Sequence, residues 1–335
     1  MKIIVDAFGG DNAPLEIIKG CRAAVDKLNV KIVLVGKKEK IEKCASENSI
    51  SLDSMEILNA DEVILMTDQP RDILKSKSNT SMAVGLKALA NGEGDAFVSA
   101  GSTGALVMGA TFLVKRIKGV KRPAIGSVLP SEKDPFILLD SGANAECTAE
   151  HLNQFAFMGN IYMNKVLNIK NPRVALANIG TEETKGDNLR LEAFEKMKDS
   201  NYNFVGNIEA RDIPYGHADV VVADGFTGNI ILKVYEGVAG VIMNNIKAIF
   251  KKNKLTMLSA LMVKGGLTDF KRRMDYSEFG GAPLMGINGA VIKAHGSSNA
   301  NAILNAIRQA KDYAENDVVG IIADSYAKSK GTAKE

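Results

Sequence analysis

The sequence predicts an α/β fold in which a mostly parallel, mixed sheet is covered by helices on both faces. Short runs of bulky apolar residues alternate with amphipathic stretches along most of the 335 residues, the pattern of strand–helix–strand crossovers. Six of the apolar runs end in short stretches of Gly, Ser, Thr, Asn or Asp that lead into helical patterns. Such turns gather at the carboxyl edge of a parallel sheet, so we expect a ligand-binding cleft there.

The expected elements follow one another in a simple order. Residues 2–6 form the first strand, and Pro14 suits the first position of the helix after it. The other expected strands are 31–35, 55–58, 96–100, 124–129, 136–140, 173–178, 204–206, 219–223 and 290–294. The clearest amphipathic helices are 150–167, 188–198, 230–250 and 299–314.

One pair of strands departs from the parallel pattern. The segment 130–135 between strands 124–129 and 136–140 is too short for a crossover helix, so this pair is expected to form an antiparallel hairpin. No linker or internal repeat interrupts the sequence. We therefore expect residues 1–335 to form a single α/β domain with the active cleft at the strand carboxyl ends, and any division near residue 170 would separate subdomains.

Composition and charge narrow the class of function. A net charge of +3 is too small to predict nucleic-acid binding, and no nucleic-acid motif accompanies it. The three cysteines (Cys21, Cys44 and Cys147) lack metal-ligand spacing, which favours reduced thiols in the cytoplasm. A strand begins at residue 2, leaving no room for a signal peptide, and no apolar stretch is expected to reach the ~18 residues that span a bilayer. We expect a soluble protein that at most lies on a membrane surface.

The turn Ala100-Gly-Ser-Thr-Gly104 is the first candidate for binding an anion. Gly101 and Gly104 allow the backbone to approach a phosphate closely, while Ser102 and Thr103 offer hydroxyl and amide donors. Ordinary helix capping explains one such turn equally well. Six turns of similar chemistry favour a shared phosphate site.

The other turns supply polar side chains with several possible roles. Carboxylates repel phosphate, so acidic and amide groups in these turns are expected to organise loops or to bind another part of the substrate. These groups are Asp6, Asp11, Asn12, Asp140, Asn144 and Asp224.

Three further side chains are candidates for catalysis. Lys185, in the turn 178–186, could give a point charge to phosphate, although a solvated loop lysine is the alternative. Asn229 begins the helix 230–250 and could either cap it or donate to an oxygen. His295 could polarise a carbonyl or hold phosphate, and its alternative is a capping or packed histidine.

Residues 247–273 form a basic and apolar segment. It contains eight basic residues and one acidic residue, a local net charge of +7. Four apolar side chains approximate one helical face: Leu255, Leu258, Leu261 and Met262. A helix with this pattern can lie in a lipid interface with its cations toward anionic headgroups. A dimer contact is the alternative, and the two are compatible.

Several familiar chemistries are not favoured. The sequence has no G-x-x-x-x-G-K-[ST], no G-x-G-x-x-G at a strand-to-helix turn, no G-x-S-x-G and no H-E-x-x-H. A P-loop kinase, an ordinary Rossmann dehydrogenase, a serine hydrolase of the elbow type and a common zinc hydrolase are therefore disfavoured. Cys147 follows the Asp140 turn but is not expected to be a nucleophile.

Four motifs in order give the sequence a resemblance. They are V-D-A-F-G-G-D-N-A-P, S-A-G-S-T-G-A, A-D-G-F-T-G-N and K-A-H-G-S-S, and together they resemble the bacterial phosphate acyltransferase family of phospholipid synthesis. The resemblance extends from Ile4 to about Ala327. Phe8 stands where the family has Met, and Ser102 stands where Asn is common; neither exchange removes the expected chemistry.

The resemblance implies a three-layer α/β/α fold similar to isocitrate and isopropylmalate dehydrogenases and to phosphotransacetylase. It also implies a homodimer that uses no metal or cofactor and transfers a fatty acyl group from acyl carrier protein to inorganic phosphate. The phosphate-binding residues would then be Gly101, Ser102, Thr103, Gly104 and Ser297, and the catalytic ones Lys185, Asn229 and His295. The family lies peripherally on the inner face of the cell membrane, which fits the segment 247–273, and its acyl phosphate passes to a membrane glycerol-phosphate acyltransferase.

Three rival functions stay open. A phosphotransacetylase acting on acyl-coenzyme A shares the chemistry and the fold type, while an isopropylmalate-type dehydrogenase would need a metal-binding set of aspartates and a nicotinamide cofactor. A lipid-surface scaffold would bind the carrier without making acyl phosphate. A basic cluster could meet the acidic carrier or could be a solvated face: Lys115, Arg116, Lys118, Lys121 and Arg122.

Overall fold

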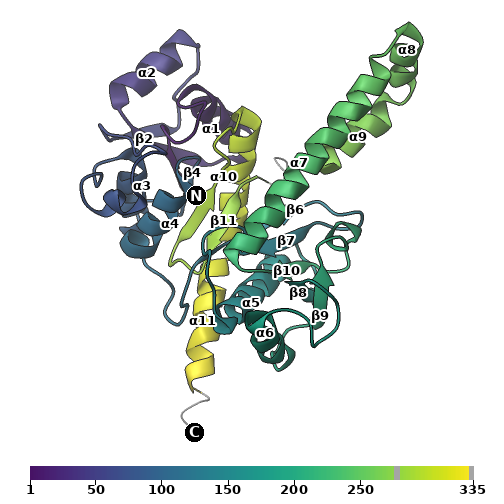
Figure 1. The fold of residues 1–335 in the computed structure, drawn as a ribbon. Helices are drawn as coiled ribbons and strands as arrows, with labels where there is room; N and C mark the ends of the chain where they lie inside the picture. The colour runs from purple at the N-terminus through teal and green to yellow at the C-terminus, as the bar shows by residue number, and fades with distance from the viewer. Residues whose placement is uncertain (275–279, 332–335) are drawn as a thin grey trace.

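The computed structural model describes residues 1–274 and 280–331, in which two sheets lie side by side (Figure 1). The first sheet has the strand order β3-β2-β1-β4-β12-β11-β5, and the second has the order β6-β7-β10-β8-β9. The strands are β1 (Lys2–Asp6), β2 (Lys31–Gly36), β3 (Met55–Asn59), β4 (Ala96–Ser99), β5 (Ala124–Ile125), β6 (Ser127–Leu129), β7 (Phe136–Leu139), β8 (Val174–Asn178), β9 (Phe204–Glu209), β10 (Val220–Val222), β11 (Ala282–Met285) and β12 (Ala290–Lys293). Of the expected single domain 1–335, residues 275–279 and 332–335 lie outside the described part.

Most neighbouring strands are parallel, as the alternating pattern predicts. The expected hairpin is confirmed, because β6 pairs with β7 in antiparallel register. The strand expected over 124–129 is split at Gly126, so that β5 ends the first sheet and β6 begins the second. The strand β11, which pairs antiparallel with both β12 and β5, was not predicted. Its Pro283 cannot donate to a strand ladder, and this argues against a strand in the sequence.

Helices cover both faces of each sheet, which confirms the α/β fold class. The longer helices are α1 (Leu15–Leu28), α2 (Lys38–Glu47), α3 (Ser81–Ala90), α4 (Thr103–Gly109), α5 (Ala149–Lys165), α6 (Asn188–Lys198), α7 (Gly225–Phe250), α8 (Lys254–Met262), α9 (Lys264–Met274), α10 (Ala300–Glu315) and α11 (Val318–Gly331). On β1, Ile3 and Val5 belong to the core that holds residues of α1 and α10, while Ile4 belongs to the core that holds residues of α3 and α4. This alternation is what a strand buried on both faces requires.

The second sheet repeats this arrangement with other helices. Ile137 and Leu139 of β7 face the core that includes residues of α5 and α6. Phe136 and Leu138 face a smaller core against which the first turns of α7 pack. The start of α7 is therefore fixed on the second sheet, close to the junction between the two sheets.

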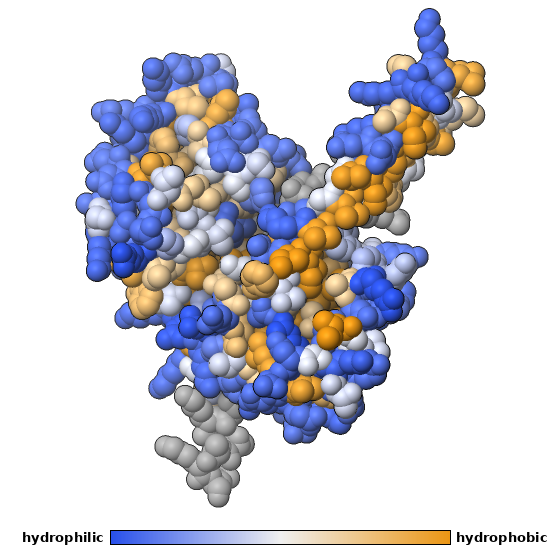
Figure 2. Space-filling view, viewed as in Figure 1, coloured by the Kyte–Doolittle hydropathy of each residue, from blue (hydrophilic) through white to orange (hydrophobic). Residues whose placement is uncertain are grey.

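The helix α7 leaves the body of the protein after these first turns (Figure 1). Its outer part projects beyond the sheets, with α8 and α9 at the far end. Figure 2 shows hydrophobic residues along this projecting helix, and six of them are more than 45% exposed: Phe226, Ile230, Val234, Val238, Val241 and Ile249. The segment 247–273 comprises the end of α7, all of α8 and most of α9.

The expectation that no stretch could span a bilayer is wrong by length and composition. Within residues 1–274 and 280–331, the helix Gly225–Phe250 is long and apolar enough to cross a membrane by those two measures. Only 6% of its apolar window is buried, so it is not a core helix. The sequence reading missed it because Lys233 and Glu236 interrupt the apolar run.

Candidate active site

A cavity of about 670 Å³ lies where the two sheets meet. Its volume is typical of small-molecule sites. Five of the six predicted turns contribute to its lining: Phe8, Gly10 and Asp11 from the first, Ala100, Gly101, Ser102 and Thr103 from the second, Ser141 and Gly142 from the third, Asn229 from the fifth, and His295, Gly296 and Ser298 from the last. The expected convergence of the glycine-rich turns is thus found for all but the turn 178–186.

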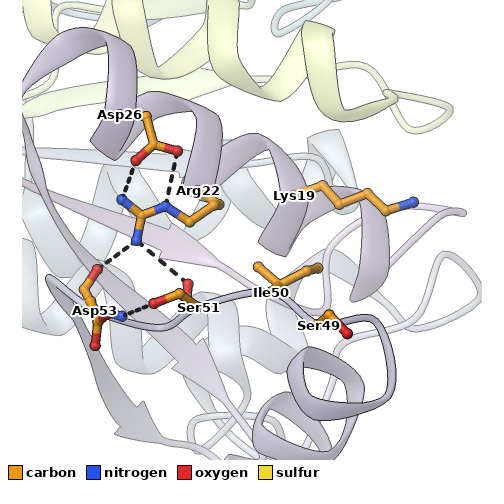
Figure 3. Close-up of a pocket in the computed structure, with 7 residues that line it drawn as sticks. All are labelled: Lys19, Arg22, Asp26, Ser49, Ile50, Ser51 and Asp53. Atoms are coloured by element: carbon orange, nitrogen blue, oxygen red, sulfur yellow. Dashed lines mark hydrogen bonds and ion pairs between the residues drawn. The ribbon is translucent and has the colours of Figure 1, made fainter.

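A second hollow, of about 550 Å³, lies on the surface between α1 and the loop 49–53 (Figure 3). The charged group at its centre is Arg22, whose guanidinium is already bonded to Asp26 and to the backbone carbonyl of Asp53 at 2.8 Å. None of the predicted turns reaches it. Its contacts tie α1 to the loop before β3, a structural role.

The first and last turns of the cavity are fastened together. The amide of Asp11 donates to the carbonyl of Gly296 at 2.8 Å, and the side-chain amide of Asn12 donates to the carbonyls of Ser297 at 3.1 Å and Ser298 at 3.3 Å. Gly10 has a φ of +97°, and a Cβ there would lie 2.8 Å from the Gly296 carbonyl oxygen. The close contact of these turns therefore depends on glycine.

Asp6 organises the second turn through Ser99. The Ser99 hydroxyl donates to the Asp6 carboxylate at 2.7 Å and accepts from the amide of Gly101 at 3.0 Å. Burial raises the pKa of Asp6, while hydrogen bonds from Ser81, Ser99 and the backbone of Phe8 oppose the rise. Asp6 thus holds the loop that carries Gly101, as the expected loop-organising role requires.

Asp140 organises the third turn in a similar way. Its carboxylate is fully buried and accepts from the backbone amides of Ile125, Gly142, Ala143 and Asn144, at distances of 2.7 to 3.2 Å. The side chain of Asn144 also donates to it at 2.9 Å. Burial raises the pKa of Asp140 and these bonds oppose the rise. The carboxylate is occupied by the protein's own donors.

Asp224 and Arg190 fix the beginning of α7. Asp224 caps the helix by accepting from the Thr227 amide at 2.9 Å, and its carboxylate pairs with the partly buried guanidinium of Arg190. Gly228 packs directly on the backbone of Asp140. The helix then presents Asn229, Leu232, Lys233 and Glu236 to the cavity.

Lys293 is a cationic site residue that the sequence did not predict. It ends β12, lines the cavity and donates from its ammonium group to the carbonyl of Ala294. Burial lowers the pKa of Lys293 to about 8; Asp6 and Asp11 oppose this effect and Lys233 adds to it. A lysine at the last position of a buried strand, just before a glycine-rich turn, is the signal that could have identified it.

His295 lies beside the two lysines of the cavity. Its Nδ1 accepts from the Ser297 amide at 3.3 Å and lies 2.9 Å from the Ser297 hydroxyl. Burial lowers the pKa of His295, the charges of Lys233 and Lys293 lower it further, and Glu236 and Asp11 oppose them. The ring is therefore neutral near pH 7, and the bond at Nδ1 assigns its proton to Nε2, which makes Nε2 a donor.

Three of the predicted catalytic and phosphate-binding residues do not line this cavity. Lys185 is exposed in its loop, where its carbonyl accepts from the Asn178 side chain at 3.0 Å. Gly104 faces Pro70, and Ser297 is bonded to His295, which does line the cavity. The functional roles of these residues stay predictions.

The cavity offers neither a metal site nor a reactive thiol within residues 1–274 and 280–331. No group of three or more His, Cys, Asp or Glu residues there could hold a metal ion. Burial raises the pKa of the Cys147 thiol to about 12, and its Sγ donates to the carbonyl of Asn144 at 3.7 Å. This thiol stays protonated near neutral pH, so it is a poor nucleophile.

Comparison with known proteins decides the family. A family model described as fatty acid synthesis protein matches residues 1–320. The phosphate acyltransferase of Thermoanaerobacterium thermosaccharolyticum is 48% identical over 96% of both chains, and that of Clostridioides difficile is 45% identical over 95% of this chain and 94% of the relative. The chain belongs to the phosphate acyltransferase family. It is therefore an enzyme of that class in fatty acid and phospholipid synthesis, and the resemblance carried by the four motifs is confirmed.

Solved structures confirm the expected fold. The EutD phosphotransacetylase from Staphylococcus aureus aligns with a TM-score of 0.64 at 16% identity, covering 94% of both chains. A putative 4-hydroxythreonine-4-phosphate dehydrogenase from Salmonella typhimurium aligns with a TM-score of 0.52 at 11% identity, covering 93% of this chain and 98% of the other. The phosphate acyltransferase family shares its architecture with these enzymes.

Proposed function

We propose that this phosphate acyltransferase transfers a fatty acyl group from acyl carrier protein to inorganic phosphate. The observation that carries the proposal is the convergence of five strand-to-helix turns on one cavity that also holds Lys233, Lys293 and His295. Backbone amides and ammonium groups suit phosphate, and the same cavity has apolar walls that suit an acyl chain.

The chemistry needs no nucleophile from the protein. A phosphate oxygen attacks the thioester carbonyl carbon, a tetrahedral oxyanion forms, and the carbon–sulfur bond breaks to give acyl phosphate and the carrier thiolate, which takes up a proton. Gly101, Ser102, Thr103 and Lys293 would hold phosphate, while the Nε2–H of His295 would donate to the oxyanion or the thiolate. Positioning and preorganised donors supply the rate enhancement.

A direct assay tests the reaction and its acyl donor. Purified enzyme is incubated with phosphate and either palmitoyl-acyl carrier protein or palmitoyl-coenzyme A at equal concentration, and hydroxylamine traps acyl phosphate as a hydroxamate. We expect the carrier-bound donor to be used more efficiently. Equal or better use of the coenzyme A donor would favour the phosphotransacetylase-like alternative, and absence of product from both would reject the proposal.

The pKa of Lys293 predicts an alkaline limit on phosphate binding. Its folded-state pKa of about 8 lies below the ordinary value, so the ammonium is present below pH 8 and is lost as the pH rises through it. We expect kcat/KM for phosphate to fall above pH 8 at a saturating acyl donor, since this ratio reports the donor-bound enzyme before phosphate binds. Lys293→Arg keeps its charge and should shift the fall to higher pH. Lys233→Arg is the matched control and should leave the fall near pH 8.

The projecting helices support a proposed location at the inner face of the cell membrane. The tip presents the four predicted contact residues to solvent: Leu255, Leu258, Leu261 and Met262 are each at least 60% exposed. The proposed homodimer would cover part of the apolar side of α7, and the proposed product would pass to a membrane glycerol-phosphate acyltransferase. The charge of 247–273 suits anionic headgroups.

Replacing Leu258 and Leu261 together with glutamate tests the membrane contact. We expect the double variant to stop co-sedimenting with vesicles that contain anionic lipid, because the charged residues remove the apolar face. Leu65→Glu, an exposed apolar position far along the chain from this segment, should leave sedimentation unchanged. Unchanged sedimentation of the double variant, with its fold intact by circular dichroism, would contradict the membrane role.

A further inference from the structure

We propose that the loop 63–66 forms the wall of the cavity that selects the length of the acyl chain. This inference rests on the proposed function. It concerns the apolar side chains of the lining, of which Phe8 belongs to the first predicted turn and the larger ones named next belong to none of these turns. The lining there includes Val63, Leu65 and Met66 from this loop, Val128 and Leu129 from β6, and Leu232 from α7.

The loop is held firmly at its base. Ile64 is 6% exposed and belongs to the core shared with α3 and α4. The carbonyl of Glu62 accepts from the amide of Ser81 at 3.0 Å, at the start of α3. The base of the loop therefore moves with the first sheet and its helices.

The tip of the loop is also shaped by specific bonds. The amide of Leu65 donates to the Asp68 carboxylate at 2.7 Å, and the amide of Asp68 donates back to the carbonyl of Leu65 at 3.2 Å. Lys77 lies 3.7 Å from the same carboxylate. This turn fixes the backbone from which two large apolar side chains project.

Those side chains remain uncovered by the protein. Leu65 is 56% exposed and Met66 is 76% exposed, although both line the cavity. When an apolar ligand covers apolar surface at the edge of a cavity, the free energy of binding becomes more favourable. Leu129, which also lines the cavity, is apolar too and only 2% exposed.

The occupant that this wall fits is the hydrocarbon chain of the acyl donor. The polar turns and the apolar walls belong to one continuous cavity, so a ligand that fills it needs an anionic or carbonyl end joined to an apolar body. A fatty acyl thioester next to phosphate has this division. The flexible thioether of Met66 adapts to chains of different shape, as methionine does in adaptable binding surfaces.

Polar substitutions of nearly equal size test the wall. Leu65→Asn and Met66→Gln nearly keep the side-chain volume and remove the apolar character at two solvent-exposed positions, where substitutions usually change the free energy of unfolding only slightly. KM and kcat are measured with octanoyl- and palmitoyl-acyl carrier protein at saturating phosphate. Val205→Thr, an exposed apolar position on β9, is the matched control.

We expect the double variant to raise KM for the palmitoyl donor about tenfold, with kcat and the octanoyl KM nearly unchanged, since a few methylenes in an apolar site carry such a factor. Equal changes for both donors would overturn the inference, because they would place the carrier's pantetheine arm or the carrier itself on the loop. Unchanged kinetics with both donors would overturn it as well.

A binding measurement separates this inference from the proposed function. Displacement of a fluorescent long-chain fatty acid from the wild-type enzyme needs no turnover, and the chain has no tryptophan to interfere with the signal. If the wild-type enzyme makes no acyl phosphate but binds the probe, and the double variant binds it about tenfold more weakly, the proposed function fails while the wall stands. Equal binding of the probe by both proteins contradicts the wall.

Discussion

Replacing Lys293 with methionine is expected to lower kcat/KM for phosphate by about two to three orders of magnitude, the cost of losing one preorganised donor to a developing anion. Lys293 lines the cavity next to the turn of His295 and faces the charges of Asp6, Asp11 and Lys233. Steady-state kinetics with hydroxylamine trapping measure the loss. The fold should not suffer: burial disfavours the charged form of Lys293 at neutral pH, so the thermal midpoint should stay level or rise.

Lys185→Ala provides the comparison for this variant. Lys185 is the catalytic cation expected from the sequence, and it lies in an exposed loop outside the cavity lining. We expect the larger loss for Lys293→Met. If Lys293→Met turns over nearly normally while Lys185→Ala does not, the loop 178–186 closes on the substrate and the assignment of Lys293 is wrong.

Replacing Gly228 with alanine should lower the free energy of unfolding by about 3 kcal/mol or more, at the upper end of what overpacking costs. A Cβ at Gly228 would overlap the carbonyl oxygen of Asp140, a backbone atom that cannot move aside cheaply. The start of α7 would have to shift from the third turn, so activity should fall as well. Urea unfolding at a fixed protein concentration measures the change.

Gly237→Ala is the matched control in the same helix. An added Cβ at Gly237 meets nothing within 4 Å, so the higher helix propensity of alanine should raise stability by about 0.5–1 kcal/mol. Equal effects at the two glycines would show that the packing of α7 on Asp140 is not what Gly228 serves.

Strand period and turn chemistry are local properties, and they predicted most of the elements. The strand over residues 2–6 and the helix over 188–198 have the expected bounds. The split at Gly126 and the strand β11 depend on how the two sheets pack against each other. This packing involves residues far apart in the sequence, so no local pattern predicts it. Lys293 was missed because a lysine that ends a strand looks like a solvated residue until the sheet order places it.

Strand order also explains which turns reach the cavity. In the second sheet, the turns after β7 and β10 contribute to the lining. The next strand along is β8, and its turn carries Lys185 one position farther from the junction of the sheets. Chain order alone does not reveal this, because β10 follows β8 in sequence yet lies between β7 and β8 in space.

The length of α7 also fixes the distance between the cavity and the far end of this helix. From Asn229 to Phe250 it has 21 steps, which at 1.5 Å per residue amount to roughly 30 Å, about the diameter of a small domain. An upright α7 with its far end on lipid would hold the reaction centre that far above the bilayer. Under the proposed reaction, this distance would leave room for a small carrier protein beneath the sheets, and the proposed acyl phosphate would have to cross it to reach a membrane enzyme.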